Sequence, residues 1–294
     1  MPHEFRADSR TANPTDISNY MKLHTALVLA LLLPLGFAVR AAEGWKMVWH
    51  DEFDRNGPPN PANWGYEHGF ERNEELQWYQ PENAYCTNGF LIIEGRREHK
   101  RNPKYVPGSN HWRTSREWID YTSASLITRH RQEFKYGKFE VRGRINTQLG
   151  SWPAFWVLGA DRPGVGWPAG GEIDIMEYYT GQIRANFVYQ RDGKAIWSAV
   201  PKPITALGGE AWSNAFHIWT MEWNATNIDL LLDGQLMNHL ALATADNADR
   251  GNPFHYPEYI LLNQAIGATG GDPAHTPFPM RFEVDWVRVY QRNE

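Results

Sequence analysis

Short runs of apolar residues, many of them alternating with polar ones, recur along most of the chain. The clearest alternation covers residues 139–145, where apolar residues or glycine at the odd positions alternate with charged residues at the even ones. Further runs rich in aliphatic and aromatic residues occupy 90–94, 228–232, 259–262 and 282–290. Such runs, separated by Gly, Pro, Asn and Asp, are typical of β-strands. Because no long helical periodicity follows the first apolar segment, the pattern predicts an all-β sandwich or barrel.

Two dipeptides mark expected hairpin turns, and one charged run marks an expected loop. Asn88-Gly89 precedes one apolar run, and Asp233-Gly234 follows another. Asn-Gly and Asp-Gly pairs favour tight turns between antiparallel strands. Residues 96–101 are the densest run of charge in the chain, and we interpret them as a solvated loop.

The N-terminal region has the pattern of an export signal. Residues 1–20 are polar and aperiodic, whereas Met21 and Lys22 are followed by an apolar run at 26–39 and by small residues. A basic start, a short apolar run and a small-residue end predict a signal peptide over 21–41 that is removed after Ala41. We interpret 1–20 as an upstream stretch with a non-native start, or as disordered, and 42–294 as a single β-domain that is secreted or periplasmic. A membrane anchor is the alternative, although the run is short for a membrane span.

Composition narrows the classes of function. The chain of 294 residues has 29 Lys and Arg against 34 Asp and Glu, a net charge of −5, and this argues against nucleic acid as a partner. A single cysteine, Cys86, excludes an intramolecular disulfide and a cysteine-based metal site. We expect a buried free thiol, no membrane association after signal removal, and a monomer. The 14% of aromatic residues indicates a ring-rich core, a binding surface lined by rings, or both.

Three acidic residues lie close together in the segment GEIDIMEY, residues 171–178. Glu172 and Asp174 share one face of a strand, whereas strict alternation would place Glu177 on the opposite face. A β-bulge around residues 175–176 adds one position and returns Glu177 to the acidic face. We therefore expect the three carboxyl groups to line up on one side of a bulged strand.

Carboxyl groups arranged in this way can hydrolyse a glycosidic bond. The two glutamate backbones would be about 13 Å apart, and side chains leaning inward would bring their carboxyls to roughly 5–5.5 Å, the spacing of retaining glycosidases. Neighbouring like charges separate the pKa values, so one carboxyl can attack while the other donates a proton. The same pattern also fits acids facing water on an edge strand, or a calcium site. Trp152, Trp156 and Trp167 lie nearby in the sequence, and rings that stack on pyranoses favour the glycosidase.

Further segments surround the acidic strand. In chain order they are WHDEF (49–53), NEELQ (73–77), NGFL (88–91), YGKFEVR (136–142), WPAFW (152–156), then, after the acidic strand, FH (216–217), MEW (221–223) and VDWVRVY (284–290). With these segments the chain resembles glycoside hydrolase family 16, in particular the bulge-containing branch of laminarinases and related endo-β-1,3-glucanases. The resemblance extends from about residue 45 to the C-terminus. It implies a β-jelly roll of two stacked antiparallel sheets, with the substrate in a groove across the concave face.

The resemblance also implies the chemistry. By position, Glu172 is similar to the family's nucleophile, Asp174 to its assisting acid and Glu177 to its general acid/base. The implied activity is endo-acting, retaining hydrolysis of β-1,3-glucan or mixed 1,3/1,4-glucan, with the polysaccharide as partner and no cofactor for catalysis.

Further roles follow from the same resemblance. Glu140 and Arg142 match positions that hydrogen-bond sugar hydroxyls. The remaining expected groove residues are Asn73, Trp156, Trp167, Asn186 and Asn263. Family members often hold one structural calcium ion on the convex side. Asp285 matches its side-chain ligand and Gly89 its carbonyl ligand, although Asp285 also fits an ordinary surface acid.

Two departures from the family pattern leave the substrate open. Many laminarinases carry Thr-x-His on the strand after the acidic one, whereas residues 186–188 here are Asn-Phe-Val. Many also carry a Trp in a later loop, which here reads GATGGDP (267–273). Another β-linked polysaccharide, such as a galactan, is therefore an alternative substrate. A glycan-binding module without turnover is the alternative from another class, and the presence of both Glu172 and Glu177 argues against it.

Overall fold

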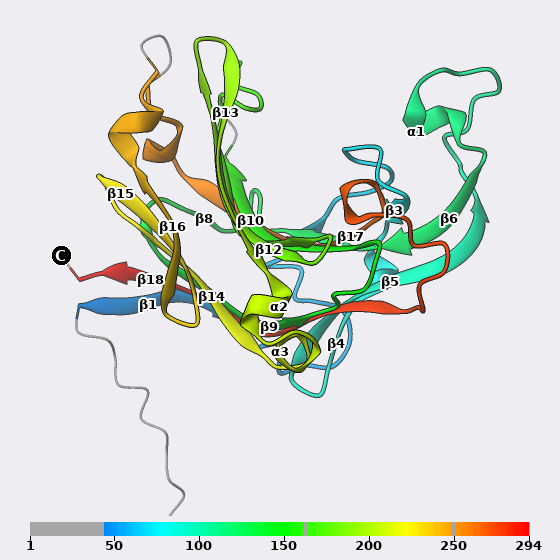
Figure 1. Ribbon diagram of the computed structural model, residues 1–294, viewed down its shortest axis with the longest axis horizontal. Helices are drawn as coiled ribbons and strands as arrows, with labels where there is room; N and C mark the ends of the chain where they lie inside the picture. Colours follow the sequence, from blue (N-terminus) through cyan, green and yellow to red (C-terminus); the bar gives the residue numbers. More distant parts are fainter. Residues whose placement is uncertain (1–43, 161–163, 248–250, 294) are drawn as a thin grey trace, which may run out of the picture. The chain divides into compact units, whose positions relative to one another are not determined.

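The strands expected from the alternation pattern form two β-sheets that pack face to face (Figure 1). The computed structural model describes residues 44–160, 164–247 and 251–293, which all belong to the unit formed by residues 41–294. The predicted signal peptide and its cleavage site lie outside the described residues. The expected all-β jelly-roll class is confirmed.

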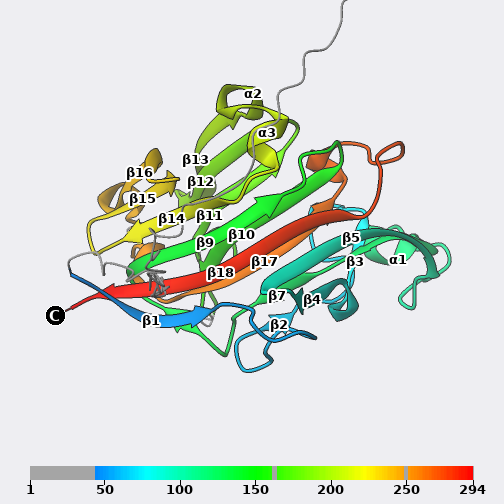
Figure 2. The same ribbon diagram turned by 90° about the horizontal axis from the view of Figure 1, so that it is seen from below.

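The first sheet has ten strands, and its main path runs β16-β15-β14-β9-β18-β5-β6-β3, with β1 paired to β18 and β4 to β5. Figure 2 shows β9, β18 and β5 side by side in this sheet. Its strands are β1 (Trp45–Asp51), β3 (Gln77–Tyr79), β4 (Ala84–Thr87), β5 (Phe90–Arg101), β6 (Trp118–Ser123), β9 (Gly137–Ile145), β14 (His217–Trp223), β15 (Asn227–Leu232), β16 (Gln235–Ala241) and β18 (Met280–Arg292).

The second sheet has eight strands in the order β13-β12-β11-β10-β17-β7-β2, with β8 paired to β17. The acidic segment forms β11, which lies inside this sheet between β10 and β12. Its strands are β2 (Gly65–Tyr66), β7 (Ser125–Ile127), β8 (Glu133–Phe134), β10 (Ser151–Gly159), β11 (Glu172–Tyr179), β12 (Gln182–Arg191), β13 (Lys194–Pro203) and β17 (Glu258–Ile266).

Helices are short and lie in the connections. The α-helices are α1 (Trp112–Ser115), α2 (Ile204–Leu207) and α3 (Glu210–Ser213), and the 3-10 helices are η1 (Pro81–Asn83), η2 (Leu242–Ala245), η3 (Pro253–His255) and η4 (Ala268–Gly270). None of the helices among the described residues has the length and hydrophobicity of a membrane-spanning segment.

The hydrophobic core fills the space between the two sheets. Phe139 and Val141 of β9 meet Phe155 and Val157 of β10 within one cluster of buried side chains. Burying such side chains contributes about 1.5–3 kcal/mol each relative to exposure. The apolar positions of β9 therefore face inward, and its charged positions point away from the core. Cys86 is a buried free thiol of the same core, as expected.

The expected hairpin turns are confirmed. Asn88 and Gly89 join β4 to β5, and Asp233 and Gly234 join β15 to β16. All four residues have positive φ angles, between 48° and 78°. This is the backbone that a two-residue type I′ turn requires, and it explains the Asn-Gly and Asp-Gly pairs.

The charged run at 96–101 is part of a strand, so its prediction as a loop is wrong. β5 continues through these residues and pairs with β6. The charged side chains find partners on β6 and the residues around it: Arg97 donates to the Tyr121 hydroxyl at 3.3 Å, and Arg101 forms an ion pair of 2.9 Å with Glu117. The density of charge indicated a solvent-exposed loop, but pairing with β6 holds these residues in an extended strand.

Candidate active site

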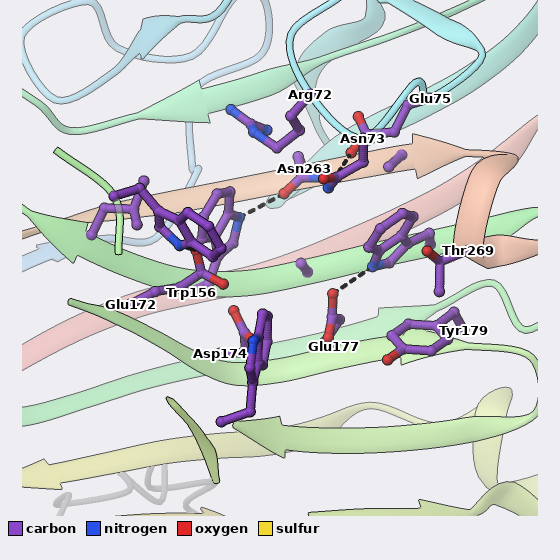
Figure 3. Close-up of a pocket in the computed structure, with 16 residues that line it drawn as sticks. Arg72, Asn73, Glu75, Trp156, Glu172, Asp174, Glu177, Tyr179, Asn263 and Thr269 are labelled. Atoms are coloured by element: carbon purple, nitrogen blue, oxygen red, sulfur yellow. Dashed lines mark hydrogen bonds between the residues drawn. The ribbon is translucent and has the colours of Figure 1, made fainter. Parts of the chain in front are cut away.

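A cleft of about 700 Å³ lies on the face of the second sheet that points away from the core. Its floor is formed by side chains of β10, β11 and β17, and the segment before β3 forms one wall (Figure 3). All three expected catalytic acids line this cleft, together with Asn73, Trp156, Trp167 and Asn263.

The acids share one face because β11 contains the predicted β-bulge. Asp174 pairs with Asn186 and Glu177 with Arg184, so residues 175–176 together oppose a single position of β12. Both bulge side chains are buried in the core between the sheets. The strand therefore resumes its alternation with residue 177 on the cleft side. The bulge prediction is confirmed, and the edge-strand alternative is excluded because β11 lies inside the sheet.

Each glutamate accepts a hydrogen bond from a tryptophan indole. Trp167 Nε1 donates to Glu172 Oε2 at 2.9 Å, and Trp152 Nε1 donates to Glu177 Oε1 at 2.7 Å. One donor comes from the loop before β11 and the other from β10. Each indole fixes one oxygen of its glutamate and leaves the other oxygen available for chemistry or for another hydrogen bond.

Asn186 links the other two acids. Its Nδ2 donates to Asp174 Oδ2 and to Glu177 Oε2, at 3.0 Å in both cases. The side chain is 2% exposed and belongs to β12, directly across from Asp174. Asn186 was expected to line the groove, but it is not among the residues that line the cleft, and it supports two of the acids instead.

Burial raises the pKa of all three carboxyl groups. Burial and then the charge of Asp174 raise the pKa of Glu172 to about 8, opposed by the Trp167 hydrogen bond and the charge of Arg72. Burial also raises the pKa of Asp174 to about 6, opposed by the Asn186 hydrogen bond. The pKa of Glu177 lies well above its ordinary value because of burial and two neighbouring acids, Asp174 and Glu172. Each glutamate has one guanidinium nearby, Arg184 for Glu177 and Arg72 for Glu172, but Glu177 has two acidic neighbours where Glu172 has one, so Glu177 is better suited to hold a proton.

A hydrogen-bonded chain supports the far side of the cleft. Trp156 Nε1 donates to Asn263 Oδ1 at 2.7 Å, and Asn263 Nδ2 donates to the Tyr79 hydroxyl at 3.1 Å. That hydroxyl donates to Glu75 Oε2 at 3.4 Å, and Asn73 Nδ2 donates to Glu75 Oε1 at 3.3 Å. Three of the expected groove residues are thus held together through Glu75, a buried acid that itself lines the cleft.

Arg72 covers the ring of Trp156. Its guanidinium carbon is 5.1 Å from the ring centroid, and the guanidinium pairs with Glu67. Trp156 is only 7% exposed. Trp156 is therefore mainly a floor residue that holds Asn263, and Arg72 is a polar wall of the cleft near Glu172.

The expectation that Glu140 and Arg142 bind sugar hydroxyls in the groove is wrong. Both lie on β9, which belongs to the first sheet, and their side chains point away from the core. Glu140 pairs with Lys138 at 2.9 Å, and Arg142 pairs with Asp285. Alternation identified the polar face of this strand but gave no information on which sheet the strand joins.

The expected calcium ligands lie on the outer side of the first sheet. Asp285 is at a register shift in β18, and Gly89 is in the turn before β5. The Oδ2 of Asp285 accepts from Arg142, so a calcium ion would share this carboxylate with a guanidinium. No group of three or more acidic, His or Cys side chains among the described residues is arranged to hold a metal. An ion here would depend on one carboxylate oxygen, main-chain carbonyls and water for its six to eight oxygen ligands.

Calcium binding at this place stays a prediction of the resemblance, and it can be measured. If the ion binds, 1 mM calcium chloride should raise the Tm of chelator-treated protein by roughly 2–4 °C, because a ligand bound only by the native state adds about 1 kcal/mol or more to stability. Asp285→Asn should remove that increase. Equal Tm values with calcium and with chelator would show that Arg142 alone satisfies Asp285.

The sequence assigned no groove position to several residues that line the cleft, although Trp152 had been noted as a ring close to the acids: Arg72, Glu75, Trp152, Tyr179, Trp197 and Thr269. Trp152 and Glu75 lie in segments that carried the family resemblance, so a signal existed for both. The Asp192-Gly193 pair marks the hairpin that joins the strand of Trp197 to β12, but it does not show that Trp197 faces the cleft.

Comparison with known proteins identifies the family to which a chain with this sequence and fold belongs. The family model for glycosyl hydrolases family 16 matches residues 93–288. The chain is 35% identical over 272 residues to a beta-glucanase of Rhodothermus marinus, covering 85% of this chain and 86% of the relative. The laminarinase catalytic domain of Thermotoga maritima MSB8 superimposes with a TM-score of 0.70 at 34% identity, covering 86% of this chain and all of that one. A structure from a study of endo-acting O-glycanases of the human gut microbiota has a TM-score of 0.78 at 32% identity and covers 86% and 93%. The chain therefore belongs to glycosyl hydrolases family 16.

Proposed function

We propose that this glycoside hydrolase cleaves internal bonds of β-1,3-glucan, or of mixed 1,3/1,4-glucan, with retention of the anomeric configuration. One observation carries the proposal. Glu172, Asp174 and Glu177 lie on a bulged strand in an open cleft, and separate indole donors orient the two glutamates. The related beta-glucanase and laminarinase support a β-glucan as the substrate.

In the first step, an oxygen of Glu172 attacks the anomeric carbon of the bound sugar. The bond from this carbon to the glycosidic oxygen breaks, and Glu177 donates its proton to the departing oxygen. The raised pKa of Glu177 keeps that proton available near neutral pH. Glu172 attacks in its ionised form, which burial and the charge of Asp174 disfavour and which the charge of Arg72 and the Trp167 hydrogen bond support.

In the second step, Glu177 is ionised and acts as a base. It removes a proton from a water molecule, which attacks the same carbon and breaks the ester to Glu172. Asp174 lies between the two glutamates, and it is linked to Glu177 through Asn186. Its charge raises the pKa of both glutamates, so the protonation state of Asp174 affects both steps.

A different β-linked glycan is the second candidate substrate. The TM-score of 0.78 with the O-glycanase structure exceeds the 0.70 with the laminarinase domain. Val188 also stands where many laminarinases carry a His. These observations support testing galactans and mucin O-glycans beside the glucans.

The proposed activity predicts both the products and their stereochemistry. Purified protein is incubated with laminarin, lichenan, curdlan, agarose, carrageenan and a mucin, and the products are sized by chromatography. We expect a ladder of oligosaccharides from laminarin or lichenan. Proton NMR of the first minutes should show the β-anomer ahead of mutarotation, because two displacements restore the configuration. Early α-anomer would exclude the retaining mechanism, and cleavage of mucin or galactan alone would favour the second candidate.

We also propose that the protein is exported to the periplasm or medium and acts as a monomer without a catalytic cofactor. The apolar run at 26–39 and the small residues after it support export. A polysaccharide substrate, too large to enter a cell, is consistent with this location.

A further inference from the structure

Two tryptophans expose large apolar surfaces at the Glu172 end of the cleft. Trp167 is 58% exposed and Trp197 is 54% exposed. Among the described residues, they are the only exposed large hydrophobic side chains that line the cleft. Trp152 and Trp156, which also line it, are buried at 8% and 7% exposure. The two exposed rings therefore offer the free aromatic faces that the floor tryptophans do not.

The register of the second sheet places Trp197 in line with Glu172. Glu172 of β11 pairs with Val188 of β12, and Val188 pairs with Trp197 of β13. Paired residues on neighbouring strands point to the same face, and neighbouring strands are 4.7–4.9 Å apart. The backbone of Trp197 is thus about 10 Å from that of Glu172. A glycan that places one unit at Glu172 and runs across β12 meets Trp197 with a neighbouring unit.

Val188 is the residue between them, and it is small, apolar and fully buried. Its chain neighbours Phe187 and Tyr189 belong to the core between the sheets, so Val188 faces the cleft side. This is the position at which many laminarinases carry a His. The buried valine therefore places no polar side chain between Glu172 and Trp197.

The two rings adjoin each other and connect to the nucleophile. Their centroids are 6.4 Å apart and their planes make an angle of 58°, so they form two tilted plates and not a parallel sandwich. Trp167 donates its indole N–H to Glu172. A sugar that packs against this pair therefore contacts a side chain that also orients Glu172.

We propose that Trp197, beside the groove residue Trp167, forms a sugar-stacking subsite for an uncharged hexopyranose unit that follows the unit bound at Glu172 in a β-linked glycan. The apolar C–H face of a pyranose matches an exposed indole face, and the pair contains no charged group. This inference rests on the proposed function, because it extends the path of the substrate from Glu172 across β12 to β13.

The test compares Trp197→Ala with Trp197→Phe and with a matched control, Trp118→Ala. Trp118 is 43% exposed on β6 and does not line the cleft. We expect Trp197→Ala to lower kcat/KM on the polymer about tenfold, mainly through KM, since one lost stacking contact is worth up to about 1.5 kcal/mol. The shortest cleaved oligosaccharide should lose less than twofold, because it does not reach β13. Trp197→Phe should restore most of the activity, and Trp118→Ala should match the wild type on both substrates.

The inference is overturned if Trp197→Ala stays within twofold of the wild type on the polymer, or loses equally on both substrates. Binding separates this failure from a failure of the proposed function. Two proteins are compared, the Glu172→Gln variant and the double variant that also carries Trp197→Ala. Each is titrated with oligosaccharides from the cleaved polymer, or with laminarin oligosaccharides if no polymer is cleaved, and binding is followed by intrinsic fluorescence. If the wild type hydrolyses nothing in the panel, the proposed function fails. Tenfold weaker binding with Trp197→Ala would still support the subsite, and unchanged binding would remove it.

Discussion

Replacement of Glu172 by glutamine is expected to lower kcat on β-1,3-glucan by at least about 10⁴-fold without unfolding the protein. Glutamine has nearly the same shape as glutamate, and its carbonyl oxygen can still accept the hydrogen bond from Trp167 that Glu172 Oε2 accepts at 2.9 Å. It carries no charge and cannot form the glycosyl ester. Oligosaccharide binding should therefore stay close to that of the wild type while turnover disappears. Reducing-sugar release, titration calorimetry and circular dichroism measure the three quantities.

The matched control is Glu140→Gln, the same change on the outer face of the first sheet. Glu140 pairs with Lys138 there, and a glutamine oxygen can still accept a hydrogen bond from that ammonium group. We expect wild-type turnover for this variant. In Glu172→Gly, azide added to an activated aryl β-glycoside should take the place of the missing carboxylate and give an α-glycosyl azide. Full activity of Glu172→Gln, or a β-glycosyl azide from Glu172→Gly, would show that Glu172 is not the nucleophile.

The catalytic strand is the part of the site that the sequence predicts best. Strict alternation separates Glu177 from the other two acids, and only an inserted residue reunites them. Because alternation alone would leave Glu177 on the opposite face from the other two acids, the sequence predicted a β-bulge. The pairing of β11 with β12 contains that bulge. The hairpin turns were predictable for a similar reason, since Asn88-Gly89 and Asp233-Gly234 encode their own backbone angles.

The side chains that reach the cleft from other parts of the fold could not be predicted in this way. The family resemblance placed Glu140 and Arg142 in the groove, and alternation could not correct this, because it gives the face of a strand but not the sheet that the strand joins. Arg72 enters the cleft from a loop far from β11 in the sequence, and its position depends on long-range contacts for which a single sequence carries no local signal. Trp197 enters from β13, which a short hairpin joins to β12, but the hairpin does not show which face of the sheet forms the cleft.

Replacement of Glu177 by glutamine is expected to lower kcat on glucan by about 10²–10⁴-fold, because the leaving oxygen is no longer protonated. An aryl β-glycoside with a good leaving group needs no such proton, so its first step should proceed at close to the wild-type rate. The glycosyl-enzyme should then accumulate, since no base activates water. Pre-steady-state release of the phenolate measures the first step, and mass spectrometry detects the adduct on Glu172. Added azide should release it as the β-glycosyl azide. Equal losses on both substrates would contradict the acid/base role.

The same variant should be more stable than the wild type at alkaline pH. Burial and the neighbouring acids raise the pKa of Glu177 well above its ordinary value of 4.5, so the folded protein holds the proton more tightly than the unfolded chain does. Wild-type stability therefore falls as the pH rises above the unfolded pKa and continues to fall until the folded pKa is passed. Glutamine does not ionise and removes this loss, so the Tm of the variant relative to the wild type should rise between pH 4.5 and pH 8. Near pH 4.5 the two proteins should melt within a degree or two of each other, and Glu140→Gln should follow the wild type throughout. A Tm difference that does not change with pH would mean that Glu177 is not held protonated in the folded cleft, and its role as the proton donor would lose its physical basis.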